Sequence, residues 1–159
     1  MKTLYTLLLA FGLCFTVHAQ NNANIVNYQN VGTQVQSQLE TLLIGNQNRL
    51  LLQAGFSSKQ LGDDNQGIKL IQAVGSEAIS NEVLQDFAAD YTKVKIIVLS
   101  DIKTNSQVIS ALDLTLFSAL QYFVIESNET LTTAFVQSLL QNVQMLENVV
   151  IVYKKEVLM

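Results

Sequence analysis

The stretch VKIIVL at residues 94–99 is short, apolar and rich in β-branched residues, which is typical of a buried β-strand. Two comparable stretches follow, LQYFVI at 120–125 and LENVVI at 146–151, and each begins 26 residues after the one before it. A weaker copy, IKLIQA at 68–73, lies one step upstream. A fixed period in this range indicates stacked units that each contribute a strand.

The segments between these stretches have helical spacing. Apolar residues recur on one helical face within 79–91 and again within 131–143, and Ser80 and Asn128 are suitable N-caps. Strand, helix and strand at this spacing imply right-handed crossovers and a parallel sheet. We therefore predict an α/β domain at 68–159, built as a small parallel sheet of repeated strand–helix units.

The repeat also predicts where the elements lie. Equivalent burial is expected for Ile97, Phe123 and Val149. The segment 106–117 is ambiguous, because the leucines within it also alternate as they would in a strand. The expected strands lie near 94–99, 120–125 and 146–152, and the expected helices near 77–91, 106–117 and 129–145.

The segment LQYFVIESN at 120–128 resembles the core of a leucine-rich repeat, L-x-x-L-x-L-x-x-N. That resemblance implies stacked strand–helix units that form a binding module. The other copies depart from it, because Ile102 and Lys154 stand where the asparagine is expected. Inner strand residues such as Ile96 and Val124 are apolar where that family exposes polar side chains, and continuous apolar strands are typical of burial on both faces. An open horseshoe-shaped repeat is the alternative.

The chain before this domain has a different composition. Glycines occur at intervals from Gly32 to Gly75 and are absent afterwards, and the whole chain has no proline. Asparagine and glutamine are concentrated before residue 67. We place a boundary between 67 and 75, and predict an Asn/Gln/Gly-rich arm at 20–67, with β or mixed structure, that precedes the α/β domain.

One motif in this arm resembles a known repeat. In QLGDDN at 60–65, Gln60, Gly62 and Asn65 match the Q-x-G-x-x-N core of curlin repeats, and Gln72 follows close to where that pattern has its second glutamine. The resemblance implies stacked β-arches of the kind that form bacterial curli fibres, and Asn/Gln ladders stabilise such stacks. A polar arm punctuated by glycine turns is the alternative.

The N-terminus has the three parts of a secretory signal peptide at 1–19. Lys2 is followed by an apolar stretch at 4–17, and the stretch ends in small residues that favour cleavage between Ala19 and Gln20. Cleavage would remove Cys14 and His18, the only cysteine and the only histidine. The exported chain would then have no thiol or imidazole for nucleophilic catalysis or metal binding. We expect it to be secreted, periplasmic or attached to the bacterial cell surface.

Composition argues against several classes of protein. The net charge is −4 and no basic stripe is present, so nucleic acid is not an expected partner. No apolar run after the leader approaches the roughly 20 residues of a membrane span. The turn at 62–67 is rich in oxygen ligands but lacks the length and closing glutamate of an EF-hand, so we predict neither a metal nor a cofactor.

The remaining candidates lie at the ends of strands, where parallel sheets place their sites. Asp101 and Glu126 should close neighbouring strands and are the only paired carboxylates suited to acid–base chemistry. The alternative is that both simply begin polar loops. Tyr122 is either part of a partner-binding edge or a core residue.

Together these patterns predict an exported, non-enzymatic binding or assembly protein. The first interpretation is an accessory or minor component of a curli-like surface fibre, with a protein partner or self-assembly at the cell surface. The interaction residues would be drawn from Gln60, Gly62, Asn65, Gln72, Tyr122, Asp101 and Glu126. A free-standing leucine-rich-repeat-like binding module is one alternative, and a small glycan or ester hydrolase using Asp101 and Glu126 is the other.

Overall fold

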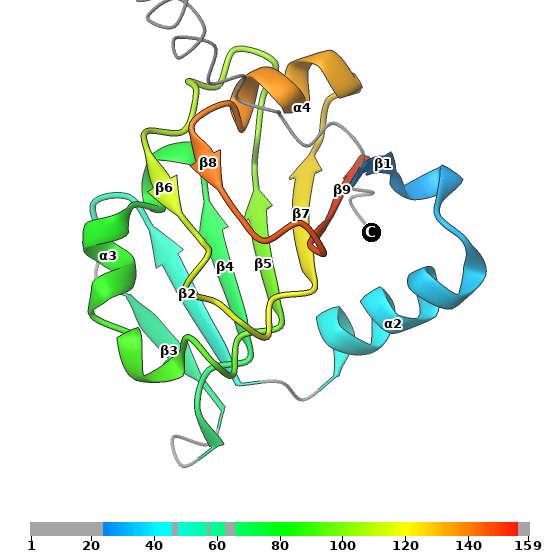
Figure 1. Cartoon of the computed structure of the whole chain (residues 1–159). Helices are drawn as coiled ribbons and strands as arrows, with labels where there is room; N and C mark the ends of the chain where they lie inside the picture. The colour runs from blue at the N-terminus through cyan, green and yellow to red at the C-terminus, as the bar shows by residue number, and fades with distance from the viewer. Residues whose placement is uncertain (1–23, 46–47, 57, 63–65, 156–159) are drawn as a thin grey trace, which may run out of the picture.

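A single seven-stranded sheet organises the chain (Figure 1). The computed structural model describes residues 24–45, 48–56, 58–62 and 66–155, and the leader with Cys14, His18 and its cleavage point lies outside them. The strand order is β1-β9-β7-β5-β4-β2-β3, and every neighbouring pair is parallel except β2 and β3. The strands are β1 (Ile25–Asn27), β2 (Arg49–Gln53), β3 (Lys59–Leu61), β4 (Leu70–Val74), β5 (Ile96–Ser100), β7 (Tyr122–Ser127) and β9 (Val150–Lys155).

The strands β4, β5, β7 and β9 occupy successive places in the sheet, so their right-handed connections lie on one face. These connections contain short elements and a small second sheet made of β6 and β8. The chain between β1 and β2 returns across the other face as α2 (Thr33–Ile44). The remaining elements are η2 (Tyr28–Asn30), η4 (Ser76–Ala78), α3 (Asn81–Gln85), η5 (Ala88–Asp90), β6 (Leu112–Asp113), α4 (Thr133–Leu139) and β8 (Val143–Gln144).

Both faces of the sheet are buried. On the face with the short helices, Ile97, Phe123 and Val136 belong to one large apolar cluster. On the other face, Leu39 of α2 packs in a smaller cluster whose strand residues are Leu70, Ile96, Val98, Tyr122, Val124 and Val152. Successive residues of β5 therefore alternate between the two clusters, and all five are buried. This confirms the α/β class with a mainly parallel sheet, and the burial expected from continuous apolar strands.

The 26-residue register holds for three strands and then changes. Ile71 pairs with Ile97, and Ile97 pairs with Phe123. Phe123 then pairs with Ile151, so the expected equivalence with Val149 is wrong by two residues. Val149 is buried, but its N–H donates to Leu146 O in a turn before β9. The connection that contains β8 thus uses two residues more than its counterparts.

The expected helices are shorter than their apolar pattern, or absent. No helix forms at 106–117. Leu112 and Leu114 are buried by alternation, Leu116 is 57% exposed, and β6 pairs with β8. The alternating leucines therefore act as a strand and its continuation, and pairing with the distant β8 takes the place of a helix.

The other two helices are interrupted for local reasons. The expected helix at 77–91 is divided into η4, α3 and η5, and the Tyr91 hydroxyl donates to Leu84 O, a carbonyl at the end of α3. Ser80 caps α3 as expected, because its side chain accepts from Val83 N–H. The expected N-cap Asn128 is instead exposed, and the cap of α4 is Thr132, which accepts from Phe135 N–H.

The segment expected to form a preceding arm contributes to the same sheet in its described residues. β1 pairs with β9 and β2 pairs with β4, so residues before 67 supply both sides of the sheet. The Arg49 guanidinium donates to Leu43 O near the C-terminus of α2 and ties that helix to β2. Within the described ranges, no helix is long and apolar enough to cross a membrane.

Candidate functional site

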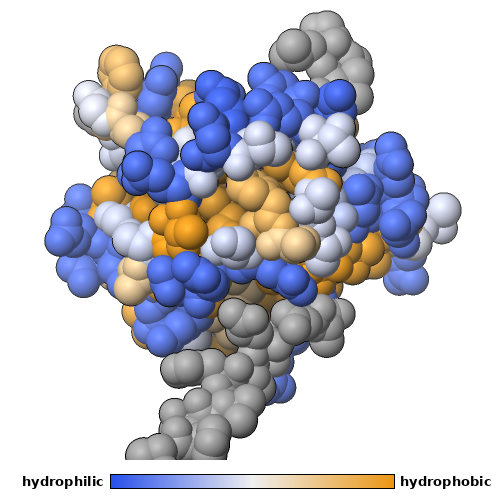
Figure 2. Space-filling model, turned by 90° about the horizontal axis from the view of Figure 1, so that it is seen from above, coloured by the Kyte–Doolittle hydropathy of each residue, from blue (hydrophilic) through white to orange (hydrophobic). Residues whose placement is uncertain are grey.

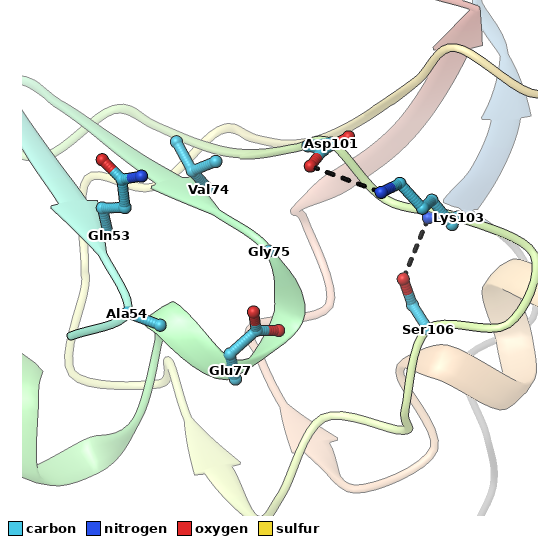
Figure 3. A pocket seen from close by; sticks show the side chains of 8 residues that line it. All are labelled: Gln53, Ala54, Val74, Gly75, Glu77, Asp101, Lys103 and Ser106. Carbon is cyan, nitrogen blue, oxygen red and sulfur yellow. Dashed lines mark hydrogen bonds and ion pairs between the residues drawn. The ribbon is translucent and has the colours of Figure 1, made fainter.

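The carboxyl ends of the parallel strands meet at the upper side of the sheet in Figure 1. Figure 2 looks onto this end and shows hydrophobic surface near its middle, bordered by hydrophilic side chains. A cavity of about 280 Å³ opens here beyond β2, β4 and β5. It is lined by Gln53, Ala54, Val74, Gly75, Glu77, Asp101, Lys103 and Ser106 (Figure 3). Parallel sheets bind ligands at this end, so the cavity is the candidate site.

Gly75 lets β4 end in a shape that forms one wall. Its φ is 86°, which only glycine adopts readily, and its N–H donates to Ser100 O at 2.9 Å. A Cβ at this position would lie 2.7 Å from Oε1 of Glu77, so the glycine also makes room for that carboxylate. Figure 3 shows the carboxylate turned toward the cavity.

Asp101 forms the opposite lip in an uncommon conformation. Its φ is 54°, and it is the only non-glycine residue with positive φ in the described ranges. Such conformations are tolerated best by Asp and Asn and tend to concentrate at ligand-binding positions. Its Oδ2 lies 3.9 Å from Lys103 Nζ, a long ion pair with both side chains about half exposed.

The loop after Asp101 is held by hydrogen bonds from two sides. Lys103 N–H donates to Ser106 Oγ at 2.9 Å, and Thr104 N–H donates to Glu129 Oε2 at 2.7 Å. Hydrogen bonds from Thr104 lower the pKa of the Glu129 carboxyl group, and the bond from its side chain contributes more than the bond from its backbone. The loop that carries Lys103 and Ser106 is therefore anchored to the chain after β7.

Glu126 lies at the end of β7 in a separate arrangement. Its Oε1 is 2.8 Å from Lys154 Nζ on β9, and the two side chains are 13% and 27% exposed. The ammonium of Lys154 also lies 5.9 Å from the centroid of the Tyr28 ring, within cation–π range. The Tyr28 hydroxyl donates to Glu40 Oε1, and burial, followed by this hydrogen bond, raises the pKa of Tyr28. The group links β7 and β9 to the segment that leads into α2.

The two carboxylates that the sequence paired thus have different partners in the structure. Asp101 lines the cavity beside Lys103, whereas Glu126 is held by Lys154 and is not among the lining residues. Sequence reasoning missed Gln53, because its place depends on β2 lying beside β4. It also missed Glu77, which directly follows β4, because only the ends of the later strands were considered. The signal that pointed to this wall was Gly75 directly after an apolar strand.

The curlin-like residues fall on different strands. Gln60 lies in β3, which is exposed throughout, and Gly62 follows it with φ 115°. Gln72 lies two strands away on β4, half-buried, 3.5 Å from the Arg49 guanidinium. Asn65 lies outside the described residues.

Tyr122 is a core residue at one side of α2. It is buried in the cluster under that helix, and its hydroxyl donates to Gln38 Oε1 at 2.6 Å. Among the residues that the structure describes, no group of three or more His, Cys, Asp or Glu is placed to hold a metal ion. The expected oxygen-rich turn at 62–67 is only partly described.

The Glu126–Lys154 pair yields the first testable prediction. Replacing Glu126 with Gln leaves the Lys154 charge half-buried without its partner, and should lower the free energy of unfolding by about 1–2 kcal/mol, between exposed and fully buried pairs. Lys154→Met in the same background should recover part of that loss. Urea denaturation of the single and double variants gives the coupling energy. A coupling near zero would contradict a structural role for the pair.

Comparison of the chain with protein-family models, with curated proteins and with solved structures gave no match to any of the three.

Proposed function

We propose that this chain is an exported, non-enzymatic binding or assembly protein, and an accessory or minor component of a curli-like surface fibre. The observation that supports it best is the position of the curlin-like segment. Gln60 and its neighbours form β3, the strand that ends the sheet order, and β3 pairs only with β2 among the described strands. Its outer side offers unpaired backbone groups to a strand of a partner.

Exposed apolar residues lie beside this edge. Leu61 is 41% exposed and pairs in register with Arg49. Arg49 contacts the Leu43 carbonyl, next to Ile44, which is 82% exposed at the end of α2. Leu61 thus neighbours Arg49 on β2, and Ile44 follows the carbonyl that Arg49 contacts, so both residues can help to anchor a partner strand that pairs with β3. Lys59 at the start of β3 disfavours indiscriminate edge pairing.

The strand–helix units support the alternative of a leucine-rich-repeat-like binding module. Ile71, Ile97 and Phe123 occupy equivalent places 26 residues apart, as stacked repeats require. The inner face of that sheet is covered by α2, however, so a concave surface of the leucine-rich-repeat kind is not free for a partner. A hydrolase is disfavoured because Asp101 and Glu126 contact different lysines and only Asp101 lines the cavity.

Substitution at the edge tests the proposal. Ile44→Lys with Leu61→Lys should weaken association with fibres of a purified curlin-repeat protein by about tenfold or more, because charges replace the apolar anchors. Leu116→Lys is the control, since Leu116 is 57% exposed, between Leu61 and Ile44, and lies outside β3. Cosedimentation of the chain, expressed without residues 1–19, measures the binding. Failure of the native chain to sediment with the fibres would contradict the curli-like version, and equal binding by both variants would remove β3 as the edge.

A further inference from the structure

The cavity at the carboxyl ends of β2, β4 and β5 has a surplus of negative charge. Its lining residues include two acidic side chains, Glu77 and Asp101, and one basic side chain, Lys103. Lys103 is 3.9 Å from Asp101, and Glu77 forms no ion pair within the described part of the chain. Among the described residues, the Glu77 carboxylate accepts one side-chain hydrogen bond, from Ser76 Oγ at the long distance of 3.5 Å. A bound molecule that brings one positive charge would neutralise the site.

The backbone places the two carboxylates at the cavity. The positive φ of Gly75 favours glycine, and the Glu77 carboxylate lies close to the position that a Cβ of residue 75 would take. Asp101 is set at the opposite lip by its own positive φ. Figure 3 shows Glu77 and Asp101 on opposite sides of one opening, with Gln53 at a third side.

The lining also narrows the class of ligand. The excess negative charge would repel an anion. A bare metal ion is disfavoured because the Lys103 ammonium would repel it and because no group of three acidic ligands lies among the described residues. Gln53 can donate and accept hydrogen bonds, and the Ser106 hydroxyl and Lys103 can serve neighbouring polar groups. The volume of about 280 Å³ lies below the usual pocket range for drug-sized ligands, about 300–1,000 Å³, and suits one small molecule.

We infer that this cavity binds a small primary ammonium compound with neighbouring hydroxyl groups, of which an amino sugar is the simplest form. The carboxylates of Glu77 and Asp101 attract the ammonium group from opposite sides of the opening, and the nearer one accepts its hydrogen bonds. Gln53 and Ser106 contact the hydroxyls, and Ala54 and Val74 supply apolar contacts. Charge-assisted hydrogen bonds of this kind are about twice as strong as neutral ones, so the ammonium decides the selectivity. The inference does not depend on the assembly role, because β3 is not part of the cavity.

The test compares two sugars of nearly equal shape. Glucosamine carries an ammonium group where glucose carries a hydroxyl, so binding of the first in preference to the second isolates the charge. We expect glucosamine to shift the backbone amide resonances of Gly75, Glu77 and Lys103 in a saturable way in 1H–15N NMR titrations, with glucose at least about tenfold weaker. Raising the salt from about 20 to about 300 mM should weaken glucosamine binding severalfold.

Matched variants assign the effect to the carboxylates. Glu77→Gln and Asp101→Asn keep the shape of each side chain, and Asn tolerates the positive φ at 101. Each should weaken glucosamine binding about tenfold, and the double variant should remove it. Glu147→Gln is the control, because it removes an exposed carboxylate outside the cavity. The amide spectrum shows whether each variant is folded.

Three results would overturn the inference. These are equal binding of glucose and glucosamine, no saturable shift at the cavity with glucosamine, or unchanged affinity in both carboxylate variants. None of them bears on fibre association, so the two proposals can fail separately.

Discussion

Replacing Ile97 with aspartate is expected to abolish folding. Ile97 is 0% exposed at the centre of β5, between Ile71 on β4 and Phe123 on β7. An unpaired carboxylate at this place would lose its hydration and gain no partner, at a cost of several kcal/mol. The total stability of a domain is only about 5–15 kcal/mol. Circular dichroism should show loss of secondary structure, and urea denaturation should show no cooperative transition.

Two further variants keep this result interpretable. Leu116→Asp makes the same change in charge at a residue that is 57% exposed, and should change stability by no more than about 0.5 kcal/mol. Ile97→Ala should fold and lose about 2–5 kcal/mol, through the cavity that it leaves. A chain carrying Ile97→Asp that unfolds at the native urea midpoint would refute the central position of β5.

The central strands could be predicted from sequence because their burial on both faces leaves a continuous apolar run. The register of β9 could not. A shift of two residues keeps every side chain on its original face, so Val149 and Ile151 fit the same pattern. The choice between them depends on the length of the connection through β8. Sequence spacing cannot reveal such an insertion where apolar residues continue on both sides of the strand boundary.

The prediction of a helix at 106–117 failed for a related reason. The leucines at 112, 114 and 116 fit a strand as well as a helix, and only pairing of Leu112 with Val143 decides between them. That partner lies 31 residues away in the chain. The N-cap of α4 was mispredicted for a similar reason. Ser127, Asn128 and Thr132 are all residue types that cap helices well, and their order in the sequence does not show which one does so.

The candidate site was predicted in part. The rule that ligands bind beyond the carboxyl ends of parallel strands pointed to Asp101, which lines the cavity. It also pointed to Glu126, whose side chain instead forms an ion pair with Lys154 on the neighbouring strand β9. Gln53 was missed because β2 belonged to a segment that composition had set apart, and Glu77 was missed because the end of β4 was not considered as a site. Composition records how polar a segment is, whereas hydrogen bonding of β2 to β4 decides where it lies.

The role of that segment leads to the second large prediction. Deleting 20–67 removes β1, α2, β2 and β3, and with them Leu39, the fully buried anchor of α2. Val98, Val124 and Val152 would then face water, and β4 and β9 would become unprotected edges. We expect the remaining chain to lack a cooperative unfolding transition and to bind the dye ANS, as chains with exposed apolar surface do.

Leu39→Ala gives a graded version of the same test. It should fold but lose about 2–5 kcal/mol, whereas Ile44→Ala, an exposed change on the same helix, should have little effect. A truncated chain that unfolds cooperatively would show that 68–159 is independent of α2. If it does not fold, loss of fibre association after truncation reports only the loss of the fold. The paired lysine substitutions at Ile44 and Leu61 then decide whether β3 binds a partner, because they change the edge and leave the covered face intact.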